Sequence, residues 1–407
     1  MEPSHFRVTR VRLKQYRSFA EADVRLEDLV FLVGPNGAGK SNFLDALRLV
    51  SEGIGGSLEE ALRERGGAAQ VRRRAPGHPD RFSVRLSFEG PGGERGPGSG
   101  AVTGTYGVQI AGKGGSGSFR IVRERCEVTA GGVRSAFRVE DGELTASTER
   151  KVPAPAPGRL LLADLGRHKS FAGVHAGLAG FRAFSLDPAA MRGLAPPRDG
   201  RALLRDGTNA GAVLHRLGRV ADGADRRRLD GYLQRIVPGL RGTRRRVLDG
   251  AETVEFAQDT AGAAHPWKFT APSVSDGTLR ALGVLLALFA PAGGRYGPVA
   301  IEEPETALHP AAAAVVREAL RDAADRRQVL VTSHSPDLLD HEEVDAGSVR
   351  AVRAEDGRSV IGVLDEPAAF ALRAGLDTAG HLLRTDGLVP RPALAADSDD
   401  APRAAQR

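Results

Sequence analysis

The segment from Gly34 to Ser41 carries glycine, lysine and serine at the spacing of a loop that binds phosphates. It satisfies the pattern G-x-x-x-x-G-K-[ST], in which backbone N–H groups turn inward around a phosphate chain, the lysine reaches the β- and γ-phosphates, and the hydroxyl binds Mg²⁺. The chain has six lysines and 51 glycines among 407 residues, so about 0.01 chance matches are expected and an ordinary glycine turn is the weaker interpretation. The pattern predicts a nucleoside triphosphate site centred on Lys40.

A second candidate is a group of carboxylates at the end of the apolar run 299–301. Glu302 and Glu303 follow this run directly, and Glu305 lies two residues further on. A carboxylate at the tip of a buried strand can hold the shell of a Mg²⁺ ion, and the next one can orient and deprotonate an attacking water. The alternative is a solvated strand end, which loses weight if the strand lies beside the phosphate loop. We predict that Glu302 holds the metal shell and that Glu303 is the catalytic base.

Two further motifs are weak when taken alone. Ser275 and Gly277 precede a mostly apolar helix, and a hydroxyl, a glycine N–H and a helix N-terminus together form an anion site, although an ordinary N-cap has the same sequence pattern. His334 follows the predicted strand 329–332, where an imidazole can contact a γ-phosphate or the polarised water. A histidine in such a place is more often structural. Only the order of the motifs along the chain therefore supports a functional role for these residues.

Apolar spacing predicts the elements that must position these motifs. The run LVFLV ends in the phosphate loop and residues 43–50 follow helical spacing, so the loop joins a buried strand to a helix. An alternating strand at 82–88 and three more at 101–110, 119–128 and 135–139 predict an antiparallel meander. A mobile loop is predicted at 90–100, and a mainly helical region at 160–240 contains one predicted strand at 181–186. Two later strands are predicted at 243–248 and 253–257, and a disordered tail at 390–407.

Composition bounds the class of protein. Hydrophobic residues make up 41% and charged residues 27%, and the longest apolar run, 281–292, is shorter than the roughly 18 residues that span a bilayer. The N-terminus has no apolar signal segment, and the single Cys126 cannot close an intrachain disulfide, so we expect a cytoplasmic protein without a membrane role. The net charge of +6 permits a nucleic-acid partner, although 51 of the 57 basic residues are arginine, a bias that GC-rich coding also produces.

The order of these motifs resembles that of an ABC-type ATPase head. The strings LKQYRSF, GPNGAGKSN, LLRDGTNAGAVLHRL, SDGTLR, IEEPETALHP and TSHSPDLLD are similar to those of RecF/SMC-like members of this class. They are most similar to the bacterial predicted ATPases of the AAA family, the OLD/RecF-like group. The resemblance covers most of residues 1–389.

The resemblance implies an α/β fold, namely a P-loop NTPase of ABC/SMC-head type with a mixed sheet, an antiparallel N-terminal β portion and a helical insertion lobe. It divides the chain into a head, 1–389, and a tail, 390–407. The head has a discontinuous core of 1–89 and 266–389, with a β-plus-helical lobe inserted at about 90–265. The implied cofactors are ATP and Mg²⁺.

The resemblance also implies a role for each matching residue. Ser41 and Glu302 are expected at the metal, Glu303 is expected to be the base, and His334 is expected to be the switch histidine. Expected at the nucleotide, most of them in the phosphate loop, are Gly34, Pro35, Asn36, Gly37, Ala38, Gly39, Lys40, Ser41, Asn42 and Arg17.

An ATP-sandwiched head-to-tail homodimer is the assembly that the resemblance implies. In it Ser275 and Gly277 contact the γ-phosphate bound by the other protomer. Two positions depart from the general pattern: Glu302 stands where Asp is usual, which favours metal contact through water, and Asp276 replaces a glycine, which places a carboxylate near a phosphate unless it points away. Gln70 is a weak candidate for the glutamine that contacts the water and the metal.

The function predicted on this basis is an ATP-driven switch in DNA repair or phage defence, with DNA or an effector protein as a possible partner. One alternative is the ATPase subunit of a membrane transporter, which the 235 residues between Lys40 and Ser275 and the ending KSN disfavour. The other is a module that uses ATP to hold a partner and turns over slowly. The region after Leu339 has no acidic D-x-D cluster of a Toprim nuclease, so we expect no nuclease activity in this chain.

Overall fold

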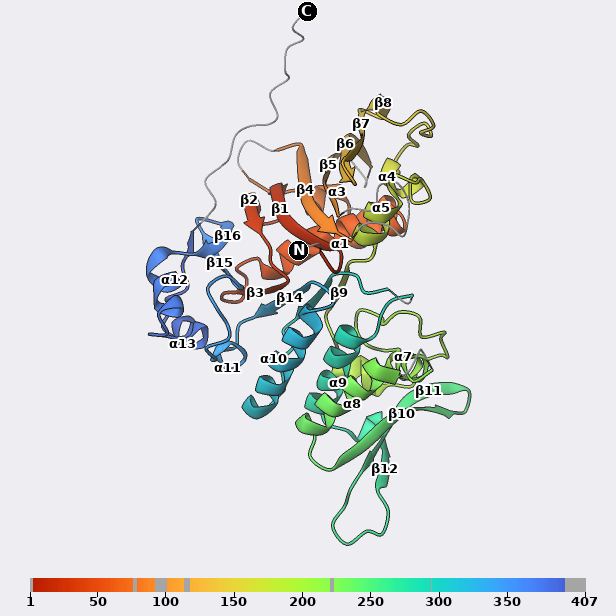
Figure 1. The fold of residues 1–407 in the computed structure, drawn as a ribbon, viewed down its shortest axis with the longest axis vertical. Coiled ribbons are helices and arrows are strands. Elements are labelled where there is room, and N and C mark those ends of the chain that lie inside the picture. The colour runs from red at the N-terminus through yellow and green to blue at the C-terminus, as the bar shows by residue number, and fades with distance from the viewer. Residues whose placement is uncertain are drawn as a thin grey trace, which may run out of the picture.

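The computed structural model describes residues 3–75, 79–91, 101–112, 118–219, 223–293 and 295–391. Two seven-stranded sheets and a smaller three-stranded sheet, with helices between and beside them, make up this part of the chain (Figure 1). The predicted loop at 90–100 and the predicted disorder of the tail fall mainly outside the described residues. Where the structure does describe the start of that tail, Pro390–Arg391 form a short strand, β17, on the edge of a sheet, so the predicted boundary at Pro390 is wrong by two residues.

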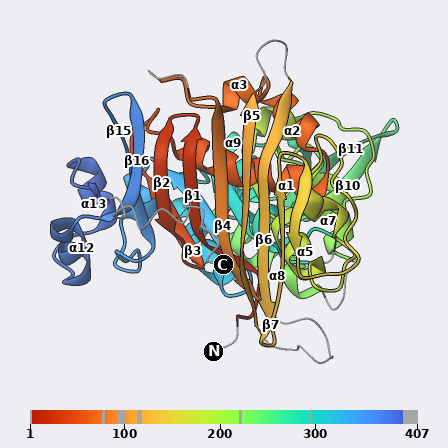
Figure 2. The ribbon, with the colours of Figure 1, turned by 90° about the horizontal axis from the view of Figure 1, so that it is seen from above.

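The first sheet contains the predicted meander and is antiparallel throughout. Its strand order is β2-β1-β4-β5-β6-β7-β8, and Figure 2 shows its strands side by side as the layer nearest the viewer. One face is apolar and packs on helix α1 (Lys40–Gly55), whereas the other carries polar and charged side chains, as the alternation predicts. The strands are β1 (Arg7–Tyr16), β2 (Phe19–Arg25), β4 (Arg81–Gly90), β5 (Val102–Gly112), β6 (Phe119–Ala130), β7 (Val133–Glu140) and β8 (Glu143–Ser147).

The second sheet has the order β17-β16-β15-β3-β14-β13-β9. Its central strands are parallel and almost completely buried, because helices and the first sheet cover both faces. The carboxyl ends of the parallel strands therefore meet at one edge. The strands are β3 (Leu29–Val33), β9 (Arg182–Phe184), β13 (Val299–Glu302), β14 (Val329–Ser333), β15 (Val349–Glu355) and β16 (Arg358–Leu364).

Helices α9 and α10 cover the face of the second sheet opposite to the first sheet. Helix α9 is apolar on almost every side and is buried along nearly its whole length, between α8, α10 and the sheet. The three-stranded sheet β10-β11-β12 projects below these helices in Figure 1. The bounds are α7 (Ala210–Leu217), α8 (Ala224–Ile236), α9 (Asp276–Phe289), α10 (Pro310–Ala324), β10 (Leu240–Leu248), β11 (Ala251–Gln258) and β12 (Trp267–Thr270).

The predicted helical region at 160–240 is broken into short helices, because glycine and proline interrupt it repeatedly. It contains the predicted strand as β9, together with α4 (Leu161–Asp164), α5 (Ala172–Ala179) and α6 (Pro188–Arg192). The other helices are α2 (Leu58–Glu64), α3 (Ala68–Val71), α11 (Pro336–Leu339), α12 (Glu366–Arg373) and α13 (Ala379–Arg384). The predicted α/β class is confirmed, and within the described part of the chain no helix is long and apolar enough to cross a membrane.

A buried carboxylate joins the first sheet to helix α4. Glu124 on β6 accepts hydrogen bonds from the backbone N–H groups of Leu161 (2.7 Å) and Leu162 (3.0 Å) and from the hydroxyl of Tyr106 (3.0 Å). Its side chain is almost fully buried, and burial raises the pKa of Glu124 to about 7. The junction between sheet and helix therefore depends on a group that titrates near neutral pH.

The raised pKa of Glu124 predicts how stability depends on pH. A carboxyl group with a higher pKa in the folded than in the unfolded chain contributes stability below the unfolded value of 4.5, and loses it as the pH rises through about 7. Relative to Glu124→Gln, we expect the wild type to gain roughly 2 to 3 kcal/mol in free energy of unfolding between about pH 8 and about pH 5. Urea unfolding measures this, with the exposed Glu143→Gln as control. A difference independent of pH would contradict the assignment.

Candidate active site

The phosphate loop lies between β3 and α1 and is closely packed from behind. Gly39 has φ of 111° and precedes the first residue of α1, and a Cβ atom there would collide with the hydroxyl of Ser359 on β16. A Cβ atom at Gly34 would collide with the carbonyl oxygen of Val352 on β15. Both positions require glycine, because the neighbouring strands leave no room for a side chain. The loop is therefore held in a fixed curve at the N-terminus of a helix, where anions are favoured.

Lys40 is buried within this loop, with 6% of its surface exposed. Its ammonium group donates to the carbonyl oxygens of Gly34 (2.6 Å) and Pro35 (3.0 Å). Among the described residues, no carboxylate forms an ion pair with it. Burial lowers the pKa of Lys40, and the more distant Glu303 and Glu305 partly oppose this shift. A buried cation without a counter-ion is costly, and a bound phosphate would supply the missing charge.

Ser41 and Glu302 lie side by side, as the motifs predict. The hydroxyl of Ser41 donates to Oε2 of Glu302 at 2.8 Å, although 261 residues separate the two in the chain. The other oxygen, Oε1, accepts from the guanidinium of Arg205 at 3.0 Å. A hydroxyl and a carboxylate oxygen at this separation are hard oxygen donors of the kind that Mg²⁺ uses together with nucleotide phosphates and water. The residues present therefore fit a Mg²⁺ ion.

Glu303 and His334 form a second contact at the same edge. Nδ1 of His334 lies 3.1 Å from Oε1 of Glu303, and the two side chains are 42% and 37% exposed, so water can reach both. The backbone N–H of Glu303 donates to the carbonyl oxygen of Thr332 at 2.9 Å, which places the carboxylate just beyond the strand end. A partly exposed carboxylate oriented by an imidazole can accept a proton from water.

A buried pair behind these residues was not predicted as functional. Glu305 accepts a hydrogen bond of 2.5 Å from the hydroxyl of Ser333, and its second oxygen is buried without a hydrogen-bond partner. Burial raises the pKa of Glu305. The pair connects the loop after β13 to the end of β14, and so positions Glu303 opposite His334. Sequence patterns showed Glu305 only as a third acidic residue near a strand end.

The predicted signature turn lies at the start of α9, and no hydrogen bond between described residues joins it to the phosphate loop. Ser275 is the N-cap and accepts from the N–H of Thr278 at 3.2 Å. The carboxylate of Asp276 is paired with Arg192 at 2.5 Å, so it is neutralised rather than presented to a phosphate. Gly277 packs against the backbone of Ala307, and a Cβ atom there would approach that carbonyl oxygen to 2.6 Å. Ser275 and Asp276 are exposed, and Gly277 is partly exposed.

Two other residues predicted at the nucleotide, Arg17 and Asn42, form hydrogen bonds with protein side chains. Arg17 donates to Asp45 of α1 at 2.7 Å, and Asn42 donates to the hydroxyl of Ser18 at 2.8 Å. Gln70 lies in α3, where it accepts from Arg74 at 2.5 Å. The strand that pairs with β13 on its outer side is β9, so the segment directly after β9 is adjacent to Glu302.

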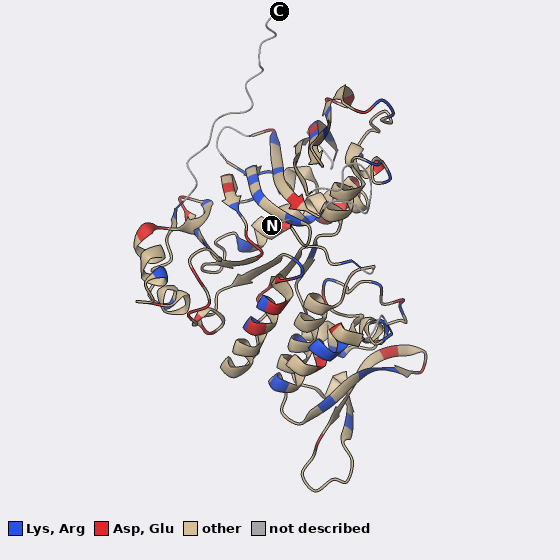
Figure 3. Ribbon diagram, in the orientation of Figure 1, with Lys and Arg blue, Asp and Glu red and all other residues tan. Residues whose placement is uncertain are grey.

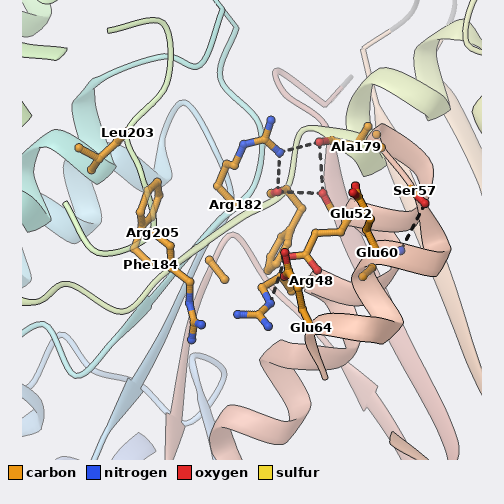
Figure 4. Close-up of a pocket in the computed structure, with 16 residues that line it drawn as sticks. Arg48, Glu52, Ser57, Glu60, Glu64, Ala179, Arg182, Phe184, Leu203 and Arg205 are labelled. Atoms are coloured by element: carbon orange, nitrogen blue, oxygen red, sulfur yellow. Dashed lines mark hydrogen bonds and ion pairs between the residues drawn. The ribbon is translucent and has the colours of Figure 1, made fainter. Parts of the chain in front are cut away.

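A cavity of about 400 Å³ lies between α1, α2 and β9, and Figure 4 shows the side chains that line it. Its charged lining residues are Arg48, Glu52, Glu60, Glu64, Arg182 and Arg205. Arg182 is turned toward the backbone, donating to the carbonyl oxygens of Ala179 (2.7 Å) and Phe181 (2.9 Å). Because Arg205 lines this cavity and also contacts Glu302, the cavity adjoins the metal side of the candidate site.

The fold is similar to that of SMC heads. The structure of an Smc head bound to the C-winged helix domain of ScpA matches with a TM-score of 0.52 at 13% sequence identity, covering 89% of this chain and 99% of that chain. An Smc head with an extended coiled coil, bound to the C-terminal domain of ScpA from Pyrococcus furiosus, matches with a TM-score of 0.52 at 12% identity, covering 91% and 99%. Fold and site together define a P-loop protein of the ABC/SMC-head class, as predicted.

The family follows from the sequence. The profile of the family described as "AAA domain, putative AbiEii toxin, Type IV TA system" matches residues 29–94 and 183–340, which is more than half of the chain. The chain belongs to this family, an AAA-type group of P-loop ATPases, and no curated protein matches it in sequence.

Proposed function

We propose that this protein binds ATP and hydrolyses it with Mg²⁺, and that it acts as a switch that assembles in the ATP state. The observation that carries the proposal is the convergence of Lys40, Ser41, Glu302, Glu303 and His334 at one edge of the second sheet. Family membership supports the same conclusion. Residues that lie up to 294 positions apart in the chain supply a cation, a metal-side pair and a base.

Each residue has a distinct role in the proposed reaction. Lys40 exchanges its two carbonyl partners for phosphate oxygens, which also provides its missing counter-ion. Ser41 and Glu302 would hold Mg²⁺, which when bound neutralises charge on the β- and γ-phosphates. Glu303 accepts a proton from the attacking water, and His334 keeps the carboxylate of Glu303 oriented. The leaving group is ADP, and the products are ADP and phosphate.

The proposed assembly is a head-to-tail homodimer. Ser275 and Gly277 lie at an exposed helix start, and the hydrogen bonds of the described residues do not join them to the phosphate loop of their own chain. A turn of this kind can complete the site of a second copy. Pairing of Asp276 with Arg192 removes the electrostatic obstacle to that contact, because the carboxylate charge is balanced.

Removal of the base gives the first functional prediction. In Glu303→Gln the side chain keeps its shape but cannot accept a proton, so ATP hydrolysis should fall by about 100-fold or more while ATP binding persists. The variant should accumulate as an ATP-bound dimer. Phosphate release measures the hydrolysis rate and light scattering measures the mass, with the exposed Glu342→Gln as matched control. Normal hydrolysis by Glu303→Gln would remove the base assignment.

Mixing two inactive variants tests whether the site is shared between protomers. Lys40→Met loses the phosphate-loop cation and Ser275→Arg blocks the turn, so each alone should be inactive. In a mixture, half of the dimers are mixed and each has one intact site, so activity should recover to about a quarter of the wild-type rate. Thermal unfolding checks that both variants fold. A mixture that stays inactive, with both variants folded and dimeric, would contradict the shared site.

The outer face of the first sheet favours DNA as the partner over an effector protein. Four arginines align across neighbouring strands in one row: Arg12 faces Arg85, and Arg125 faces Arg138, with Gly107 between the two pairs. Like charges in direct cross-strand contact destabilise a sheet, and neighbouring carboxylates or an anionic ligand can offset this cost. Asp23 and Glu127 balance Arg12 and Arg125, but no described carboxylate forms an ion pair with Arg138.

The row has the dimensions of a duplex contact. Strands are spaced by about 4.8 Å, so the four arginines span roughly 20 Å, similar to the width of a DNA helix. Figure 3 shows basic segments on β1 and β4 of this sheet. We propose that this face contacts the phosphate backbone of DNA, because guanidinium groups pair with phosphate oxygens irrespective of base sequence.

Substitution of two arginines of this row tests the proposal. Arg85→Gln with Arg138→Gln should weaken duplex binding for every sequence and reduce the slope of log affinity against log salt by about 2. The control is Arg201→Gln with Arg219→Gln, which removes the same charge from the helical region. Fluorescence anisotropy at several salt concentrations measures both. Equal losses in the two double variants, or no DNA binding by the wild type, would contradict the proposal and favour a protein partner.

A further inference from the structure

Arg205 lies in the string LLRDGTNAGAVLHRL and is a residue of the candidate site to which the sequence analysis assigned no role. It lies outside the phosphate loop and the acidic strand end, in the segment between α6 and α7. Its guanidinium donates to Oε1 of Glu302 at 3.0 Å, across 97 residues of sequence. Ser41 donates to Oε2 of the same carboxylate. The two oxygens of Glu302 are therefore divided between a residue of the phosphate loop and a residue of the helical region.

The backbone around Arg205 is fixed. The amide side chain of Asn209, which is 3% exposed, accepts from the N–H of Leu204 at 2.8 Å and donates to the carbonyl oxygen of Ala202 at 2.9 Å. The carbonyl oxygen of Arg205 accepts from the N–H of Ser185 just after β9 at 3.1 Å. Three hydrogen bonds thus hold a short loop at the edge of the second sheet, and the guanidinium extends from a defined point.

The contact of Arg205 with Glu302 has a physical reason. Glutamate has one more rotatable bond than aspartate, so an unrestrained Glu302 would lose more side-chain entropy when it is fixed at a metal. A guanidinium that donates to one oxygen restricts this rotation through a charge-assisted hydrogen bond. Because Arg205 contacts Oε1 and leaves Oε2 beside Ser41, it does not occupy the oxygen that faces the phosphate loop.

We propose that Arg205 is a positioning residue for the metal-side carboxylate. It holds the carboxylate of Glu302 turned so that Oε2 stays beside Ser41, and it makes metal affinity depend on the loop that leads into α7. This inference rests on the proposed function, since it assumes a divalent metal between Ser41, Glu302 and the phosphates. Outer-shell partners of metal ligands contribute to metal affinity in this way.

The test measures metal binding directly, without hydrolysis. Mn²⁺ affinity is determined by electron paramagnetic resonance in the presence of ADP for the wild type, Arg205→Gln, Arg205→Lys and the control Arg201→Gln, whose arginine is exposed and pairs with Asp199. We expect Arg205→Gln to weaken Mn²⁺ binding about 10-fold, Arg205→Lys to weaken it less, and Arg201→Gln to leave it unchanged. Affinity for ADP without metal should be the same in all four chains.

A double variant separates positioning from a general structural effect. If Arg205 acts through Glu302, Arg205→Gln should cause no further loss of Mn²⁺ affinity in a Glu302→Gln chain. A further 10-fold loss there, or Mn²⁺ binding by Arg205→Gln that is as tight as or tighter than that of the wild type, would overturn the proposal. If instead the wild type itself fails to bind Mn²⁺ with ADP, the proposed function fails, and that result is distinct from a failure of the Arg205 assignment.

Discussion

The register of three parallel strands is the constraint on which the rest of the site depends. Glu302 of β13 pairs with Thr332 of β14, and Ser333 of β14 pairs with Val33 of β3. These strands end at the same edge, so the phosphate loop, the glutamates and His334 all begin there. A slip of one residue in β13 would turn Glu302 to the opposite face of the sheet. Because the strands are buried on both faces, the loops beyond them must stabilise the register together with apolar packing.

Several charged groups at this edge lack a counter-ion or a full set of hydrogen bonds. Lys40 has backbone partners only, and buried polar atoms of Glu305 and Arg280 have no hydrogen-bond partner among the described residues. Burial lowers the pKa of Arg280 from α9, while the carboxylates of Glu303 and Glu305 oppose that shift. Each such group lowers stability, so the two apolar cores must offset the cost. This conflict between local electrostatics and packing is expected at a functional site rather than in a purely structural core.

Sequence patterns predicted those features that depend on residues close together in the chain. The phosphate loop, the paired glutamates and the alternating strands of the meander depend on neighbours within a few residues, and the first two resemble known motifs. The pairing of Asp276 with Arg192 and the contact of Arg205 with Glu302 depend on segments brought together by the fold. The role of Gln70 stays a prediction, since its described hydrogen bond joins it to Arg74. Sequence alone also did not show that β9 is the outer neighbour of β13.

One short loop connects the two halves of the proposed mechanism. Glu303 and Ala307 both have left-handed backbone conformations, with φ of 48° and 64°, which cost about 1 kcal/mol or more each for residues other than glycine. Glu303 contacts His334 at the candidate site, whereas the carbonyl of Ala307 packs against Gly277 of the signature turn. In the proposed dimer that turn contacts the partner's nucleotide. Relaxation of this loop after hydrolysis would therefore move the turn directly, so coupling between the two sites requires no longer path through the protein.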